Sequence, residues 1–155
     1  MARTRRPVVE GWFTGDTVPD GEFRLLATRC PACAAVFFPR VDDVCRNPDC
    51  AGDGPLDELP LPPRGRVWSY TDGRYRPPPP YVSDPDVPWE PYVLLAVELA
   101  AEGMVVLGQA APGVRTADLA VGMEVEVVPG VLNEDAAHTW TTWHWRPVVT
   151  TEDRA

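Results

Sequence analysis

The chain has 155 residues, which suits one domain or a small module joined to a modest one. Its formal net charge is −9 and all 14 basic residues are arginine, so the composition argues against general nucleic-acid binding, which needs cationic surfaces to neutralise phosphates. No stretch approaches the roughly 20 apolar residues of a membrane span, and no apolar run of a secretory signal follows Met1, so we expect a cytoplasmic protein without membrane partners.

Residues 1–22 form an N-terminal arm in this interpretation. Trp12 and Phe13 lie in a glycine-broken segment with room for one short helix at most. The two aromatic side chains either cover the core of this chain or mark a surface for a partner. The 19 prolines of the sequence keep the expected helix content low.

Residues 23–60 contain the only four cysteines, which are Cys30, Cys33, Cys45 and Cys50. Their Cys-x2-Cys and Cys-x4-Cys pairs can sit on two turns and converge on one tetrahedral metal. Four thiolates close the coordination sphere, so the pattern predicts a structural zinc and not a catalytic one. Two disulfides and a rubredoxin-like iron site are the alternatives. With short strands at 22–28 and 36–40, this segment is expected to be a zinc ribbon, and we place a linker at 51–63.

Residues 61–150 contain five segments with β character, at 67–71, 92–99, 104–109, 122–128 and 139–145. Five strands without a closing helix fit an OB-type Greek-key barrel, so the whole chain is expected to be mainly β. A proline-rich loop at 74–91 joins the first two strands, where OB folds commonly shape a binding face. Residues 151–155 are a tail.

The order of these parts resembles the acyl-CoA-associated OB-fold family, whose members carry a rubredoxin-like zinc ribbon. The resemblance covers nearly the whole chain and rests on Phe38-Pro39-Arg40, the 65–71 and 91–103 segments, and the glycine that opens the 122–128 strand. The 97–103 and 139–147 segments look most like the actinobacterial domain that partners a thiolase-like steroid side-chain aldolase. The x4 spacing of the second cysteine pair departs from the common pattern, which changes the shape of the turn and not the number of ligands.

The resemblance implies an accessory subunit of a carbon–carbon lyase. The reaction would be retro-aldol cleavage of a steroid side-chain β-hydroxyacyl-CoA that releases propionyl-CoA, with acyl-CoA near the interface and the catalytic residues on the thiolase-like partner. A MaoC-like hydratase domain is a further implied neighbour, because this domain can occur fused behind one. The alternatives are an accessory subunit of a different thiolase-like acyltransferase, a nucleic-acid-binding ribbon and OB module, and an independent CoA-dependent enzyme.

The residue inventory agrees with a non-catalytic role, so we assign no catalytic residue. The only histidines are His138 and His144, and neither has an identifiable partner in the sequence. Guanidinium groups suit the phosphates of CoA. The candidate CoA-binding residues are therefore Arg40, Arg46, Arg64, Arg66, Arg74 and Arg76, and scattered surface arginine is the alternative interpretation. Six tryptophans are more than one small core hides. The candidate partner-interface residues are Trp12, Phe13, Trp89 and Trp143.

Overall fold

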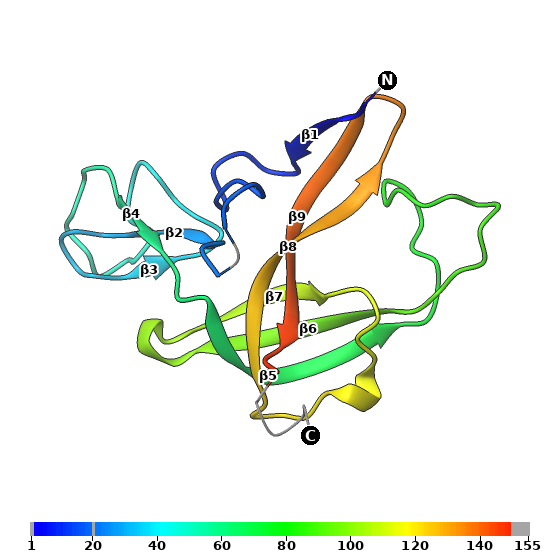
Figure 1. Ribbon diagram of the computed structural model, residues 1–155. Helices are drawn as coiled ribbons and strands as arrows, with labels where there is room; N and C mark the ends of the chain where they lie inside the picture. Colours follow the sequence, from blue (N-terminus) through cyan, green and yellow to red (C-terminus); the bar gives the residue numbers. More distant parts are fainter. Residues whose placement is uncertain (1, 20, 150–155) are drawn as a thin grey trace.

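The structure is a computed structural model that describes residues 2–19 and 21–149. A β barrel carries a smaller sheet that projects from one side, at the left of Figure 1. The proline-rich loop projects from the other side of the barrel (Figure 1). The tail predicted at 151–155 lies outside the described residues.

The barrel consists of β5 (Arg64–Gly73), β6 (Tyr92–Leu99), β7 (Met104–Ala110), β8 (Glu124–Glu134) and β9 (His138–Pro147). The strands pair in the order β5, β6, β7, β9, β8, and β8 closes the ring by pairing with β5. The β7–β9 pairing is parallel and the others are antiparallel. Two 3-10 helices, η1 (Ala100–Glu102) and η2 (Thr116–Asp118), are the only helices among the described residues. The predicted five-stranded OB-type barrel is confirmed.

The barrel core is filled from alternate positions of its strands, because successive side chains of a strand point to opposite faces. Val67, Val97, Val125 and Trp145 are each at most 1% exposed. Gly108 on β7 leaves room for two indoles, since a Cβ there would lie 2.7 Å from both Trp143 Nε1 and Trp145 Cδ1. Trp143 and Trp145 are two residues apart on β9, so their side chains share the face of the strand that meets Gly108.

The N-terminal arm joins the barrel as a strand. β1 (Thr4–Pro7) pairs in parallel with β9, so the arm extends the sheet beyond the closed ring. The described residues of the arm contain no helix, in contrast to the short helix expected there. Pro7 ends β1, and Gly11 adopts a positive φ of 79°, so the backbone turns at the point where a helix would have to run.

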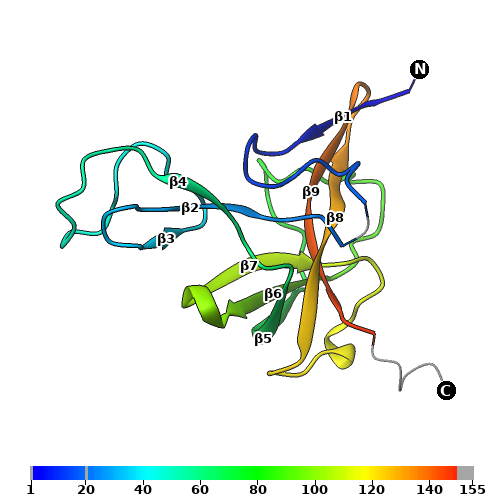
Figure 2. The ribbon, with the colours of Figure 1, turned by 60° about the vertical axis from the view of Figure 1, so that its left-hand side comes forward.

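The aromatic side chains of the arm connect all three parts of the molecule. Trp12 packs against Phe38 of the ribbon and Trp143 of β9, with ring centroids 5.7 Å and 6.2 Å away. Phe13 lies 6.0 Å from Trp143 by the same measure. These four residues, here called the aromatic junction, hold the ribbon against the barrel, and the approach of the two parts is visible in Figure 2.

The smaller sheet is the ribbon, and it contains β3 (Val36–Phe37), β2 (Leu26–Arg29) and β4 (Asp57–Pro60) in that order. β4 lies within the 51–63 segment that we predicted to be a linker, so that interpretation is wrong for those residues. A four-residue edge strand is too short to show a period in sequence, and only its pairing with β2 reveals it. The apolar core of the ribbon is small, with Cys30, Val41 and Leu56 as its buried members.

The proline-rich loop, residues 74–91, is held by its own aromatic side chains. Trp89 donates its indole N–H to the Gly73 carbonyl at 3.1 Å, and its ring packs edge-on against Tyr81 and Tyr92. The Arg76 guanidinium lies over the Trp89 ring, 5.5 Å from its centroid.

None of the helices described in the chain has the length and apolar character needed to cross a bilayer.

Candidate metal centre

The four cysteines of the ribbon meet at one point. Cys30 and Cys33 lie on the turn after β2, and Cys45 and Cys50 lie on the loop between β3 and β4. Their four sulfur atoms lie within 4.8 Å of one another. The first turn is closed by a hydrogen bond from the Ala34 amide to the Cys30 carbonyl, with Ala34 in the left-handed region at φ 63°.

The sulfur positions fit a tetrahedral zinc site. With Zn–S bonds of about 2.3 Å, the sulfurs of a tetrahedron are about 3.8 Å apart. The Cys30–Cys50 and Cys33–Cys45 sulfur pairs are 3.8 Å and 3.7 Å apart. A disulfide needs a separation of about 2.05 Å, and all four cysteines are free thiols, so the disulfide alternative is wrong.

Backbone amides surround the sulfurs and stabilise their charged form. The amides of Asn47 and Gly52 donate to the sulfurs two residues before them, Cys45 and Cys50, at 3.5 Å and 3.3 Å. The Asn47 side chain also donates to the Cys33 sulfur at 3.6 Å. Hydrogen bonds that favour a thiolate over a thiol prepare a site for a cation. The sequence did not single out these donors, although the fixed spacing of two residues is a usable signal.

The thiol pKa values show why the site needs a cation. The Ala35 amide and the Asn47 side chain lower the pKa of Cys33 to about 6. The Asn47 amide acts in the same direction on Cys45, but burial and the neighbouring Cys30 and Cys33 thiols outweigh it and raise the pKa of Cys45 to about 12. Adjacent thiolates repel each other, so a divalent metal is what allows all four to ionise. The donor set therefore fits structural zinc, which leaves no open coordination position.

Gly52 lets the two cysteine turns approach each other closely. A Cβ at this position would lie 2.9 Å from the Cβ of Ala32 and 3.2 Å from the Cys50 sulfur. Both contacts are shorter than the ordinary carbon–carbon separation of about 3.5 to 4.0 Å. The glycine is therefore part of the metal centre, and the sequence analysis missed it.

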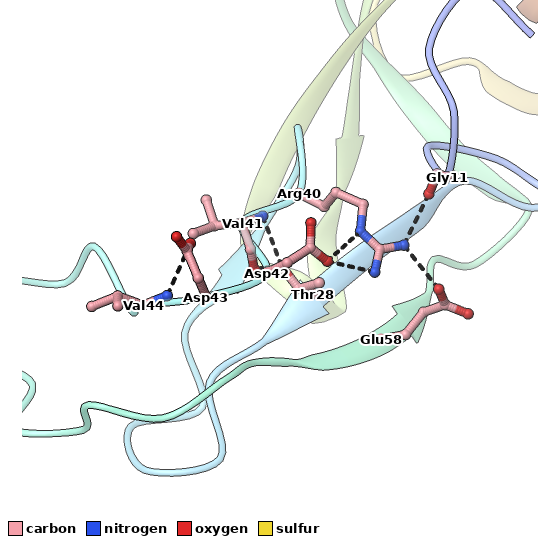
Figure 3. Close-up of polar contacts among 8 residues, drawn as sticks. All are labelled: Gly11, Thr28, Arg40, Val41, Asp42, Asp43, Val44 and Glu58. Carbon is pink, nitrogen blue, oxygen red and sulfur yellow. Dashed lines mark hydrogen bonds and ion pairs between the residues drawn. The ribbon is translucent and has the colours of Figure 1, made fainter.

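Polar contacts beside the metal site fix the ribbon to the arm. The Arg40 guanidinium donates to Gly11 of the arm at 2.9 Å, to Glu58 of β4 at 2.8 Å and to Asp42 at 2.8 Å, as Figure 3 shows. The neighbouring carboxylates, first Asp42, raise the pKa of Arg40 further. In the same view the buried Thr28 hydroxyl donates to the Val41 carbonyl and accepts from the Val41 amide. Arg40 is thus engaged inside the protein.

The other candidate CoA-binding arginines do not converge on one pocket. Arg64 pairs with Glu124 at 3.4 Å, and Arg74 pairs with Asp72 at 3.0 Å. Arg76 donates to Ser83 and to the carbonyls of Asp84 and Val87 in its own loop. Arg66 donates to the Gly122 carbonyl at 3.0 Å. Arg46 is exposed near the metal site and has no ion pair with any described residue.

Three of the four candidate interface residues are used internally, because Trp12, Phe13 and Trp143 belong to the aromatic junction. Trp89 lies in the aromatic cluster of the proline-rich loop. Each of these side chains is buried or half-buried in this chain. They support the arrangement of the parts, and their role in a partner interface stays a prediction.

Neither histidine belongs to a recognisable catalytic group. His138 is near the end of the β8–β9 hairpin, with Nδ1 3.4 Å from an Asp135 carboxylate oxygen. His144 is buried over Gly130, and its Nε2 has no hydrogen-bond partner among the described residues. Burial lowers the pKa of His144, so it is neutral at pH 7.

Comparisons with known proteins show what the ribbon and the barrel are similar to. Residues 21–56 match the family model described as the ChsH2 rubredoxin-like zinc ribbon domain. This segment is therefore similar to the zinc ribbon of ChsH2 proteins. A chain of the solved structure titled "Ltp2-ChsH2(DUF35) aldolase" is similar to the present chain, with 28% identity and a TM-score of 0.58. The similarity covers 81% of this chain and 86% of that chain. The resemblance inferred from sequence is confirmed by both findings, and the barrel is part of the similarity because the ribbon alone is much shorter.

Proposed function

We propose that this chain is the accessory, non-catalytic subunit of a thiolase-like aldolase that acts on acyl-CoA thioesters. The observation that carries the proposal is the combination of the two comparisons. The similar solved structure is named for two components, and the ribbon match supports ChsH2 as the component that corresponds to this chain. In the finer form of the proposal, the complex cleaves a steroid side-chain β-hydroxyacyl-CoA and releases propionyl-CoA.

The chemistry of the chain agrees with an accessory role. The four cysteines occupy one closed metal centre, and His144 is buried without a partner. A nucleophile paired with a base, which covalent catalysis requires, is not found among the described residues. The acid and base of the retro-aldol step would therefore belong to the thiolase-like subunit, while this chain supports the assembly and the CoA-ester site.

Within this proposal the best contacts for CoA phosphates are the arginines that form no ion pair with a described carboxylate. Arg46 has no ion pair with a described residue, and the Arg66 guanidinium donates only to a backbone carbonyl. Arg40, Arg64 and Arg74 would have to exchange a carboxylate for a phosphate. The proposal also includes a MaoC-like hydratase domain as neighbour, and a cytoplasmic location, where free thiols and metal thiolates persist.

The test is co-expression with the thiolase-like subunit from the same genome. We expect a complex that co-elutes and cleaves a steroid β-hydroxyacyl-CoA, with propionyl-CoA detected by mass spectrometry. The partner alone should be inactive or insoluble. The proposal is wrong if the two chains elute separately and the partner alone has the full rate. Salt-sensitive binding of a single-stranded oligonucleotide would favour the nucleic-acid alternative instead, against the charge of −9.

A further inference from the structure

One face of the barrel has an apolar centre that none of the described residues covers. The inward residues Val67, Val97 and Val106, from three adjacent strands, are each at most 2% exposed. The side chains that alternate with these valines along each strand point outward. The strand pairing aligns three of them, Ser69 of β5, Ala96 of β6 and Leu107 of β7. We call Trp68, Ser69, Ala96, Glu98, Val105 and Leu107 the β5–β7 outer face.

A β-bulge brings a tryptophan onto this face. The β5–β6 register shifts between Val67 and Ser69, so Trp68 is the extra residue of the bulge. A bulge re-aims a side chain that regular alternation would direct elsewhere. Trp68 is 60% exposed as a result. It is the only exposed tryptophan among the described residues.

The apolar centre is contiguous across the three strands. Leu107 is 68% exposed and Val105 is 41% exposed, and both point outward on β7. Ala96 lies between Ser69 and Leu107 in the pairing, and although it faces outward it is only 9% exposed, which fits cover by larger neighbouring side chains. These side chains expose on the order of 300 Å² of apolar surface, which is the size of the largest apolar patch on many soluble monomers, and such patches are often functional.

Charge at the edge of the face indicates what covers it. Glu98 pairs in register with Arg66 and Val105 and is exposed, and it has no ion pair with a described residue. Two copies of this chain, each of net charge −9, repel each other, which argues against a second copy as the occupant. A different protein that carries an apolar patch is the complementary occupant.

We propose that the β5–β7 outer face is the surface that docks on the thiolase-like subunit, with Trp68 and Leu107 as its central contacts. This inference rests on the proposed function. Tryptophan is enriched among the few interface residues that dominate binding, and such residues lie at the centre of a contact within a polar rim. Glu98 and its in-register neighbour Arg66 belong to that rim.

The experiment compares Trp68→Glu, Leu107→Glu and Leu132→Glu in the full-length, zinc-loaded chain. Leu132 is the control, because it is 43% exposed on β8 and lies outside the β5–β7 outer face. Circular dichroism and zinc content establish that each variant is folded. Affinity for the thiolase-like subunit from the same genome is measured by calorimetry. Hydrogen exchange of the wild-type complex, which needs no variant, reports protection at residues 66–71 and 104–109.

We expect the Trp68 and Leu107 variants to lose at least about 30-fold in affinity, and the Leu132 variant to bind like wild type. The inference is overturned if all three bind equally, if protection appears elsewhere, or if the wild-type chain dimerises alone through this face. If the wild-type chain does not bind the thiolase-like subunit at all, the proposed function itself fails, and the inference fails with it.

Discussion

Replacing Gly52 by alanine tests the structure of the metal centre most directly. The new Cβ would begin 2.9 Å from the Ala32 Cβ and 3.2 Å from the Cys50 sulfur, so one cysteine turn must move away from the other by roughly half an ångström or more. Overpacking of this kind costs about 1 to 3 kcal/mol. The reduced backbone freedom of the unfolded chain offsets about 0.4 to 1 kcal/mol of that.

The net cost of Gly52→Ala is therefore about 1 to 2 kcal/mol, and because the strain acts on the sulfurs it appears mainly as a loss of zinc affinity of roughly 5-fold to 30-fold. Competition against the chromophoric chelator 4-(2-pyridylazo)resorcinol measures that affinity. Gly54→Ala is the matched control, because no atom lies within 4 Å of a Cβ placed there and its φ is ordinary. The control should bind zinc like wild type.

A second variant removes the atom that the new methyl group meets. In an Ala32→Gly background, Gly52→Ala should recover most of the lost affinity, because the 2.9 Å contact no longer exists. Non-additivity of this kind is the signature of direct contact. The reasoning is refuted if Gly52→Ala binds zinc within twofold of Gly54→Ala, or if the Ala32→Gly background restores nothing.

Three further predictions concern the ribbon, the barrel core and the buried histidine. Removal of zinc by a chelator should unfold the ribbon, because its own buried core has only three residues, while the barrel stays folded. NMR spectra should then lose amide dispersion only at residues 23–60, and a loss in the barrel as well would contradict the prediction. Gly108→Ala should destabilise the barrel by about 1 to 2 kcal/mol, or roughly 2 to 8 °C in melting temperature, since its Cβ meets Trp143 and Trp145. An unchanged or higher melting temperature would show that the two indole side chains move aside without cost. Burial lowers the pKa of His144, so its contribution to stability is present above the unfolded pKa of about 6.5 and is lost as pH falls below it. Between pH 8 and pH 5 the free energy of unfolding, measured with denaturant, should therefore fall less in His144→Gln than in the wild type, and equal falls would assign the pH dependence to other groups.

Several structural features were predictable because their signals are local in sequence. The spacing of Cys30, Cys33, Cys45 and Cys50 predicted one metal centre, since two close pairs on turns have few other uses. The 92–99 and 104–109 segments predicted the strands β6 and β7, because each is a run of apolar β-formers. The mainly β character followed from proline content and short alternating segments.

Other features depend on which segments meet, and sequence periodicity carries no such information. β4 is visible only through its pairing with β2, and the arm became a strand because β9 offered a free edge. The candidate arginines seemed equivalent in sequence, but Arg40 is held by partners 29 and 18 residues away, at Gly11 and Glu58, whereas Arg46 is not. The same holds for the tryptophans. Trp12 and Trp143 find each other in the aromatic junction, while the bulge in β5 turns Trp68 to the surface.

The sequence by itself thus determined the metal ligands, the order of the parts and the barrel strands, because cysteine spacing and side-chain alternation are properties of short segments. Only the tertiary structure decided which charged and aromatic side chains are free to meet a partner. That outcome depends on long-range pairing and on one irregular register in β5, and neither leaves a pattern along the chain.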